Sequence, residues 1–270
     1  GSISMMQGNE ADWHYVPLNN SFGQSVNNVF YATFGSQKAF VKVNASPLLA
    51  SISQVGLTPK IIWTKRNSNG DMLTAQSWVD GVVLAATEMG DMQVNQTLAT
   101  LHHSKMLVEA FKKFGNDVTT PKQLVDRLHQ HAHRSLIQNT YLSNALSELR
   151  EATPKFDAQN AVVVHGDVNH HNWLKNDHSG KIYLVDWDTV ALSDAFVDVA
   201  HLLSHYIAPN QWREWLEYSG YRVDEETFVK VKWYGTLSFL KQINENLWSD
   251  NLQAANLEIL GLRNFCAIFK

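Results

Sequence analysis

Two short stretches of the sequence hold the side chains best suited to chemistry. Asp167 and Asn172 lie in Val164–Asn172, and Asp186 lies in the next hydrophobic stretch. A carboxylate such as Asp167 can orient and deprotonate an attacking hydroxyl. The amide oxygen of Asn172 and the carboxylate of Asp186 are hard oxygen ligands of the kind that Mg²⁺ prefers. The pattern predicts phosphoryl transfer from a magnesium-bound nucleotide, with Asp167 as the catalytic residue and Asn172 and Asp186 as the metal ligands.

The order and spacing of these residues carry a family resemblance. His165-Gly166-Asp167 is followed by Asn172, and then by Val185-Asp186-Trp187-Asp188 at the end of an apolar stretch. Kinases use an Asp–x4–Asn pair followed by a strand that ends in Asp. The sequence resembles the aminoglycoside phosphotransferase and choline kinase family, relatives of protein kinases that act on small molecules. The likeness runs from about residue 13 to 265, and within the family it is greatest to the bacterial YtmP-like group, which contains the cell-cycle regulator CcrZ.

The resemblance assigns nucleotide-binding roles to residues near the N-terminus. Lys42 is the one charged residue in Phe40–Val43, and it would hold the phosphates of ATP. Ser21 and Gly23 would belong to a loop that covers those phosphates. Gln76 and Trp78 would belong to the hinge whose backbone groups read the adenine edge. ATP and Mg²⁺ are therefore the expected cofactors.

One departure from the kinase pattern concerns the partner of Lys42. No Asp or Glu occurs between Lys42 and Asp71, so the predicted helix at 47–55 cannot supply the glutamate that pairs with this lysine in protein kinases. Either another carboxylate takes this role, or the nucleotide phosphates alone neutralise the lysine. Asp188 has two interpretations, as a second metal contact or as a cap at the end of a strand.

Other residues near the motif are interpreted as support. His165 is expected to brace the loop through hydrogen bonds, and Asp198, by resemblance, is also expected to support it. A group of aromatic residues follows, with two interpretations: core packing, or a wall or cage for a sugar or a quaternary ammonium group. These residues are Tyr206, Trp212, Trp215, Tyr218, Tyr221, Trp233 and Tyr234.

The elements that must position these residues change in character along the chain. Strand-like stretches dominate the first part, at 29–34, 39–43, 61–63 and 72–78, whereas helical spacing dominates after residue 90 except for a short β region between 161 and 186. The predicted fold is α+β and bilobed, like that of protein kinases, with a small β-rich N-terminal lobe (5–80) and a larger helical C-terminal lobe (81–270). A cleft between the lobes is the expected ligand site.

Composition limits the class of protein. The 270 residues carry a net charge of −4, and 18% are charged, so the basic excess of a general nucleic-acid binder is missing. The chain has one cysteine and no apolar run of membrane-spanning length, which favours a cytoplasmic protein.

Three functions remain open from the sequence. The leading one is an ATP- and Mg²⁺-dependent kinase acting on a hydroxyl of a small molecule. By resemblance the acceptor would be a ribose- or deoxyribose-like sugar, with a link to control of replication and division and a protein partner there. The second is a choline- or aminoglycoside-type kinase. The third is a regulatory pseudokinase scaffold that binds nucleotide without turnover, which the missing glutamate favours and the intact Asp167, Asn172 and Asp186 oppose.

Overall fold

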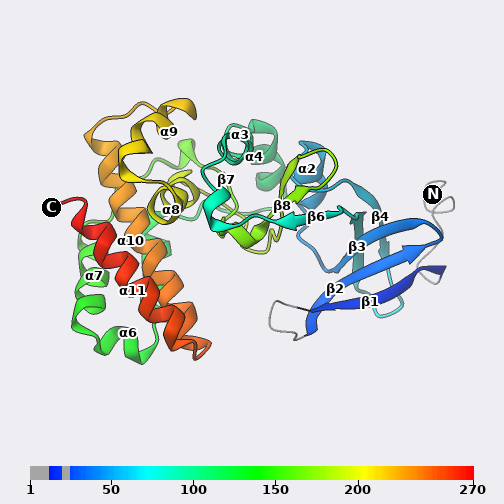
Figure 1. Ribbon diagram of the computed structural model, residues 1–270, viewed down its shortest axis with the longest axis horizontal. Helices are drawn as coiled ribbons and strands as arrows, with labels where there is room; N and C mark the ends of the chain where they lie inside the picture. The colour runs from blue at the N-terminus through cyan, green and yellow to red at the C-terminus, as the bar shows by residue number, and fades with distance from the viewer. Residues whose placement is uncertain (1–11, 20–24) are drawn as a thin grey trace. The chain divides into compact units, whose positions relative to one another are not determined.

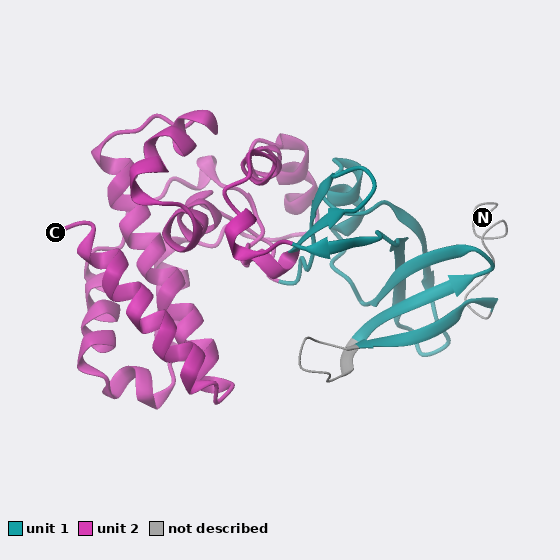
Figure 2. Ribbon diagram, in the orientation of Figure 1, with its two compact units in different colours: residues 1–83, 173–188 teal, residues 84–172, 189–270 magenta. Residues whose placement is uncertain are grey.

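The computed structural model describes residues 12–19 and 25–270, and the chain forms two compact units (Figure 2). The first unit holds the chain up to Val83 together with Trp173–Asp188, and the second holds Leu84–Asn172 and Thr189–Lys270. The expected boundary at residue 80 lies close to the first change of unit. The segment 173–188, however, was expected in the second lobe and belongs to the first unit, because it pairs there with residues far back in the sequence.

A five-stranded antiparallel sheet in the order β1-β2-β3-β5-β4 forms most of the first unit (Figure 1). Its strands are β1 (His14–Asn19), β2 (Ser25–Phe34), β3 (Gln37–Val43), β4 (Ile61–Arg66) and β5 (Met72–Ser77). Alternate side chains of β3 point to opposite faces. Val41 is therefore fully buried against Trp13 and Trp63, while Lys42 is on the other face, between Val29 of β2 and Thr74 of β5.

A second, three-stranded sheet explains why the segment 173–188 joins this unit. Its strands, in the order β6-β8-β9, are β6 (Gly81–Val83), β8 (Trp173–Asn176) and β9 (Ile182–Leu184). The N–H of Leu184 also donates to the carbonyl of Leu57, at 2.9 Å. The helix expected at 47–55 is the shorter α2 (Leu49–Gln54), because the Ser46 hydroxyl accepts the N–H of Leu48 in a turn before the helix begins.

Helices dominate the second unit. They are α3 (Met92–His102), α4 (Lys105–Lys113), α5 (Pro121–Gln130), α6 (Arg134–Gln138), α7 (Thr140–Glu151), α8 (Phe196–Tyr206), α9 (Trp212–Tyr218), α10 (Glu225–Trp248) and α11 (Leu252–Ala267). The long helix α10 is central, since it packs against α6, α7, α8 and α11 (Figure 1). Two short strands, β7 (Val162–Val164) and β10 (Ala191–Ser193), pair antiparallel beside them.

Most of the aromatic group after residue 205 packs in this helical core. Trp212, Trp215, Trp233 and Tyr234 are each at most 6% exposed. The indole N–H of Trp233 donates to the carbonyl of Leu149, and that of Trp212 donates to carbonyl groups at the end of α8. Core packing is thus the correct interpretation for these four, and they do not form an open wall. Among the described helices, none is both long enough and apolar enough to cross a membrane.

Candidate active site

The loop that carries Asp167 follows β7 directly. Gly166 has a φ of 90°, and a Cβ there would lie 2.7 Å from the carbonyl oxygen of Thr189. The Thr189 hydroxyl in turn donates to the carbonyl of His165, at 2.8 Å. The chain can therefore turn sharply at residue 166 only because glycine tolerates this backbone conformation and leaves room for Thr189.

The buried carboxylate of Asp198, on α8, lies beneath this turn. Its oxygens accept the backbone N–H groups of His165 (2.8 Å) and Gly166 (2.9 Å) and a hydrogen bond from Nε2 of His102 (2.8 Å). Burial alone would raise the pKa of Asp198, but the hydrogen bond and charge of His102 and the loop N–H groups outweigh it, so the pKa is lowered. Asp198 is therefore ionised, and its carboxylate holds the backbone of the loop at His165 and Gly166.

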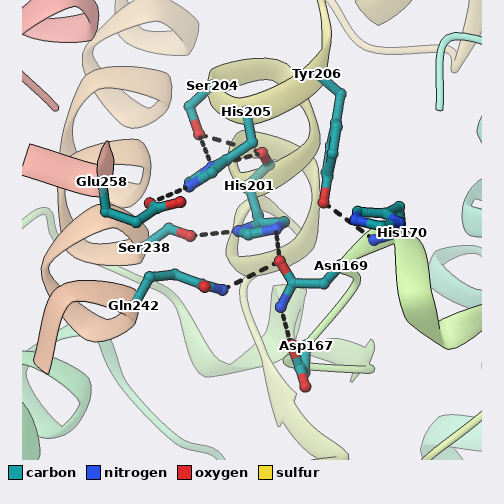
Figure 3. Close-up of polar contacts among 10 residues, drawn as sticks. All are labelled: Asp167, Asn169, His170, His201, Ser204, His205, Tyr206, Ser238, Gln242 and Glu258. Atoms are coloured by element: carbon teal, nitrogen blue, oxygen red, sulfur yellow. Dashed lines mark hydrogen bonds and ion pairs between the residues drawn. The ribbon is translucent and has the colours of Figure 1, made fainter. Parts of the chain in front are cut away.

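Two asparagines hold the carboxylate of Asp167 from within the loop. The Asn169 side-chain amide donates to Oδ1 of Asp167 (Figure 3). Nδ2 of Asn172 donates to the backbone oxygen of Asp167 at 2.7 Å and to its Oδ2 at 3.2 Å. His165, which is fully buried, accepts the N–H of Asp167 through Nδ1. These contacts fix the orientation of the Asp167 carboxylate before any substrate binds.

Asn172 in the second unit and Asp186 in the first each carry an oxygen of the type that divalent cations bind. Because Nδ2 of Asn172 is committed to Asp167, its Oδ1 is the atom left to accept, and the side chain is nearly buried. Asp186 has a φ of 61°, and its exposed carboxylate accepts the N–H of Asp188 at a long 3.4 Å.

Lys42 pairs with Asp188, which the sequence could not show. The ammonium Nζ contacts Oδ1 of Asp188, and the side chains are 19% and 62% exposed. The carboxylate that is missing between residues 42 and 71 is thus replaced by one 146 positions along the chain. Of the two interpretations of Asp188, neither included this pairing.

Lys42 and Asp188 line a cavity of about 410 Å³ within the first unit. Apolar side chains line the rest of it, including Val29, Phe40 and Leu174. A volume of this size and a mixed apolar and charged lining fit a nucleotide, whose flat base needs apolar walls and whose phosphates need cations.

Gln76 and Trp78 also line this cavity, but they differ from the expected hinge. The Gln76 amide donates to Thr58 and to the carbonyl of Pro59, and the N–H of Trp78 donates to Lys38 at 3.3 Å. The N–H of Ser77 likewise donates to the carbonyl of Lys60. These donors serve the first unit's own structure, so adenine would have to use other groups of this segment. Ser21 and Gly23 lie outside the described residues.

A separate cavity lies beside Asp167 in the second unit. A space of about 80 Å³ is lined by Asp167, His201, Ser238 and Gln242, and it adjoins a larger one of about 370 Å³. The two spaces share six lining residues: Leu124, Gly166, Thr189, Val197, Lys241 and Glu245. Together they offer room for a small molecule next to the carboxylate of Asp167.

Asn169 and His201 were not singled out from the sequence as functional residues. His201 lies 32 positions after Asn169, and its Nε2 is 2.9 Å from Oδ1 of Asn169 (Figure 3). The available signals were the density of polar residues in Asn169–Asn172 and the position of His201 one helical turn after Asp198. Neither signal specifies a contact between two distant segments.

A family model and several solved structures are similar to this chain. The sequence model of the family described as "Phosphotransferase enzyme family" matches residues 27–228. Choline kinase LicA from Streptococcus pneumoniae has a similar structure, with a TM-score of 0.64 and 15% identity over 97% of this chain and 96% of that one.

Two complexes with bound nucleotides are also similar in structure. The GDP and kanamycin complex of APH(2")-IIia has a TM-score of 0.65 and 19% identity, covering 98% of this chain and 97% of that one. Spectinomycin phosphotransferase APH(9)-Ia, in complex with ADP and spectinomycin, has a TM-score of 0.61 and 14% identity, covering 96% and 89%. At these identities the likeness shows the fold: a protein-kinase-like fold, with an antiparallel sheet of five strands in the first unit and a helical second unit. The predicted fold class is confirmed.

Proposed function

The chain belongs to the phosphotransferase enzyme family, and from this premise we propose that it transfers the γ-phosphate of ATP to a hydroxyl of a small, neutral polyhydroxy compound. Asp167 would accept the hydroxyl proton, Asn172 and Asp186 would hold Mg²⁺, and Lys42 would bind the phosphates. Bound Mg²⁺ would neutralise charge on the transferred phosphoryl group. The observation that carries the proposal is the Asp167 carboxylate, fixed by two asparagines at the wall of a cavity.

The charges around that cavity favour a neutral acceptor. Its two shared charged residues, Lys241 and Glu245, have opposite sign, and the larger space adds Arg127. The basic Lys241 and Arg127 are balanced by the acidic Glu245 and Asp167, so the lining has no excess of negative charge to hold a polycation such as an aminoglycoside. In the remaining polar lining of the smaller space, Ser238 and Gln242 keep oxygen atoms that can accept hydrogen bonds from hydroxyl groups. A pentose of the ribose or deoxyribose type is the acceptor we propose.

A quaternary ammonium acceptor has less support. Binding such a group through cation–π contacts needs several aromatic faces around it. Among the described residues that line the two spaces, Tyr234 is the aromatic one, and it is 1% exposed with its hydroxyl directed to Asp194. The pseudokinase scaffold loses its supporting feature as well, because Asp188 supplies the carboxylate partner of Lys42.

A phosphate-transfer screen tests the proposal. Labelled ATP or GTP with Mg²⁺ would be offered with pentoses, hexoses, choline, ethanolamine and kanamycin, and the Asp167→Asn variant would be the control. We expect transfer from ATP to pentoses that the variant lacks. Strong turnover of choline or kanamycin with silent sugars would reject the acceptor class. Equal phosphate transfer by wild type and Asp167→Asn, or no transfer by either protein, would reject the proposed kinase activity.

The resemblance to the YtmP-like group adds a narrower proposal, a protein partner in replication or division control. The experiment is affinity capture of division and replication proteins with wild type and with Asp167→Asn. A partner bound by both proteins would separate the regulatory role from turnover, and no specific partner would reject that role.

A further inference from the structure

A chain of hydrogen bonds runs from Asp167 to helix α10 through two residues without an assigned role (Figure 3). The Asn169 amide contacts Oδ1 of Asp167, and Nε2 of His201 lies 2.9 Å from Oδ1 of Asn169. Nδ1 of His201 contacts the hydroxyl of Ser238, and Nε2 of Gln242 donates to Oδ1 of Asn169 at 3.1 Å. His201 lies on α8, whereas Ser238 and Gln242 lie on α10.

The Asp167 carboxylate at one end of this hydrogen-bond network decides which group donates in each of its bonds. A carboxylate oxygen only accepts, so Asn169 must turn its NH₂ group to Asp167 and its Oδ1 away. Oδ1 in turn only accepts, so Nε2 of His201 must carry the proton. In a neutral ring Nδ1 is then an acceptor, and Ser238 donates to it. Each group donates toward Asp167, an arrangement in which neighbouring hydrogen bonds strengthen one another.

The surroundings of His201 keep its ring neutral. The residue is 5% exposed, and its ring stacks on that of His205 at 4.3 Å. Burial, followed by the electrostatic effect of the basic side chains His205, Lys241, His171 and His165, lowers the pKa of His201 well below 6.5. The histidine therefore has one proton on a fixed nitrogen, which suits a positioning role and not proton transfer.

We propose that His201 is a positioning residue for phosphoryl transfer, acting through Asn169 on the carboxylate of Asp167. The proposal rests on the proposed function, because it assigns His201 a task in the same reaction. A carboxylate rotates easily about its last side-chain bond. Only one orientation of the Asp167 carboxylate is well placed to take the proton from the substrate hydroxyl. His201 and Gln242 hold the Asn169 amide from behind, so that Asn169 holds Oδ1 of Asp167 in place.

A matched pair of variants tests this role. In His201→Gln the amide Nε2 is as many bonds from Cβ as the ring Nε2, so the donor to Asn169 is kept. In His201→Asn the amide reaches only the position of Nδ1, so that donor is lost. Both variants remove the ring stacked on His205. We expect kcat to fall by about 10- to 100-fold in His201→Asn and by much less in His201→Gln, with KM for ATP unchanged in both.

Coupling to Asn169 gives the second readout. Asn169→Ala alone and the double variant with His201→Asn should have the same kcat, because His201 acts only through Asn169. Nitrogen NMR of ¹⁵N-histidine protein, with no substrate present, should show the Nε2–H tautomer for His201. An Nδ1–H tautomer, equal kcat in the two His201 variants, or additive losses in the double variant would overturn the positioning role while Asp167-dependent turnover stands. Absence of Asp167-dependent turnover in wild type would reject the proposed function, and the positioning role with it.

Discussion

In the second unit, the fully buried carboxylate of Asp198 accepts three hydrogen bonds, whereas in the first unit Lys42 has an ion pair with Asp188, whose side chain is 62% exposed. A buried network of this kind is costly to disturb, and an exposed pair contributes little to stability. The loop around Asp167 is therefore fixed in advance, whereas the proposed exchange of the Asp188 carboxylate for phosphates at Lys42 would cost little stability. Four predictions test this difference.

The largest effect should separate Asp167 from Asp186. Asp167→Asn removes the base and should lower turnover by about 10²- to 10⁴-fold with little change in nucleotide affinity. Asp186→Asn removes a charged metal ligand and should weaken Mg²⁺-dependent nucleotide binding as well as turnover. A coupled assay and calorimetry with and without Mg²⁺ measure both quantities. Similar, small effects of the two substitutions would contradict the assigned roles.

Asp198→Asn should have the largest effect on stability. The amide cannot accept from all three donors, so we expect a loss of roughly 3–5 kcal/mol in the free energy of unfolding, measured by urea denaturation. Because the pKa of Asp198 is lowered from its usual 3.8, the wild-type contribution is present above about pH 4 and is lost as the pH falls below that value. The variant should lack this part of the acid dependence; an unchanged free energy of unfolding at pH 7 would argue against the buried network.

Two glycines with positive φ allow a matched comparison between the units. Gly166→Ala places a Cβ against Thr189 and should cost roughly 2–4 kcal/mol of stability and much of the turnover. Gly180→Ala, in the first unit, meets no atom within 4 Å and should cost about 1–2 kcal/mol through backbone strain alone, with turnover kept. Thermal unfolding and the coupled assay measure both. Equal losses would show that the contact with Thr189 is not what requires glycine at 166.

The smallest effect on stability is expected at Lys42. Lys42→Met should raise KM for ATP by about tenfold or more, because a charged contact to phosphate is worth roughly 1.5–3 kcal/mol. The free energy of unfolding should change by less than about 1 kcal/mol. Asp188→Asn is the control that breaks the same ion pair without removing the cation, and its KM for ATP should rise less. A stability loss as large as that of Asp198→Asn would contradict the exchangeable role of Lys42.

What the sequence could predict depended on local pattern. Periodicity located most strands and helices, because alternating and helical spacing are properties of neighbouring residues. Helical spacing after residue 90 does not show where one helix ends and the next begins: α5 and α6 are separated by a turn, because His133 caps α6 through its Nδ1. The short strand β10 was also missed, because its three residues are held by pairing with β7 and carry no period of their own.

In the candidate site, too, local patterns could be predicted from the sequence and long-range contacts could not. Asp167, Asn172 and Asp186 were found from their types and spacing, and their roles stay predictions. The contacts of Lys42 with Asp188 and of Asn169 with His201 join residues 146 and 32 positions apart. Such contacts are decided by tertiary packing, and a single sequence holds no pattern that pairs them.

The segment Trp173–Asp188 also sets an order of events during synthesis. During synthesis the N-terminus leaves the ribosome first, and domains generally fold as their residues emerge. When residue 83 has emerged, β6 still lacks its partner β8, and Lys42 still lacks Asp188. More than one hundred further residues must be made before the first unit can be completed, and Leu84–Asn172 of the second unit emerge in between. A fragment that stops after β6 would thus lack both a sheet partner and a counter-ion, and the first unit can be completed only once residue 188 has been made.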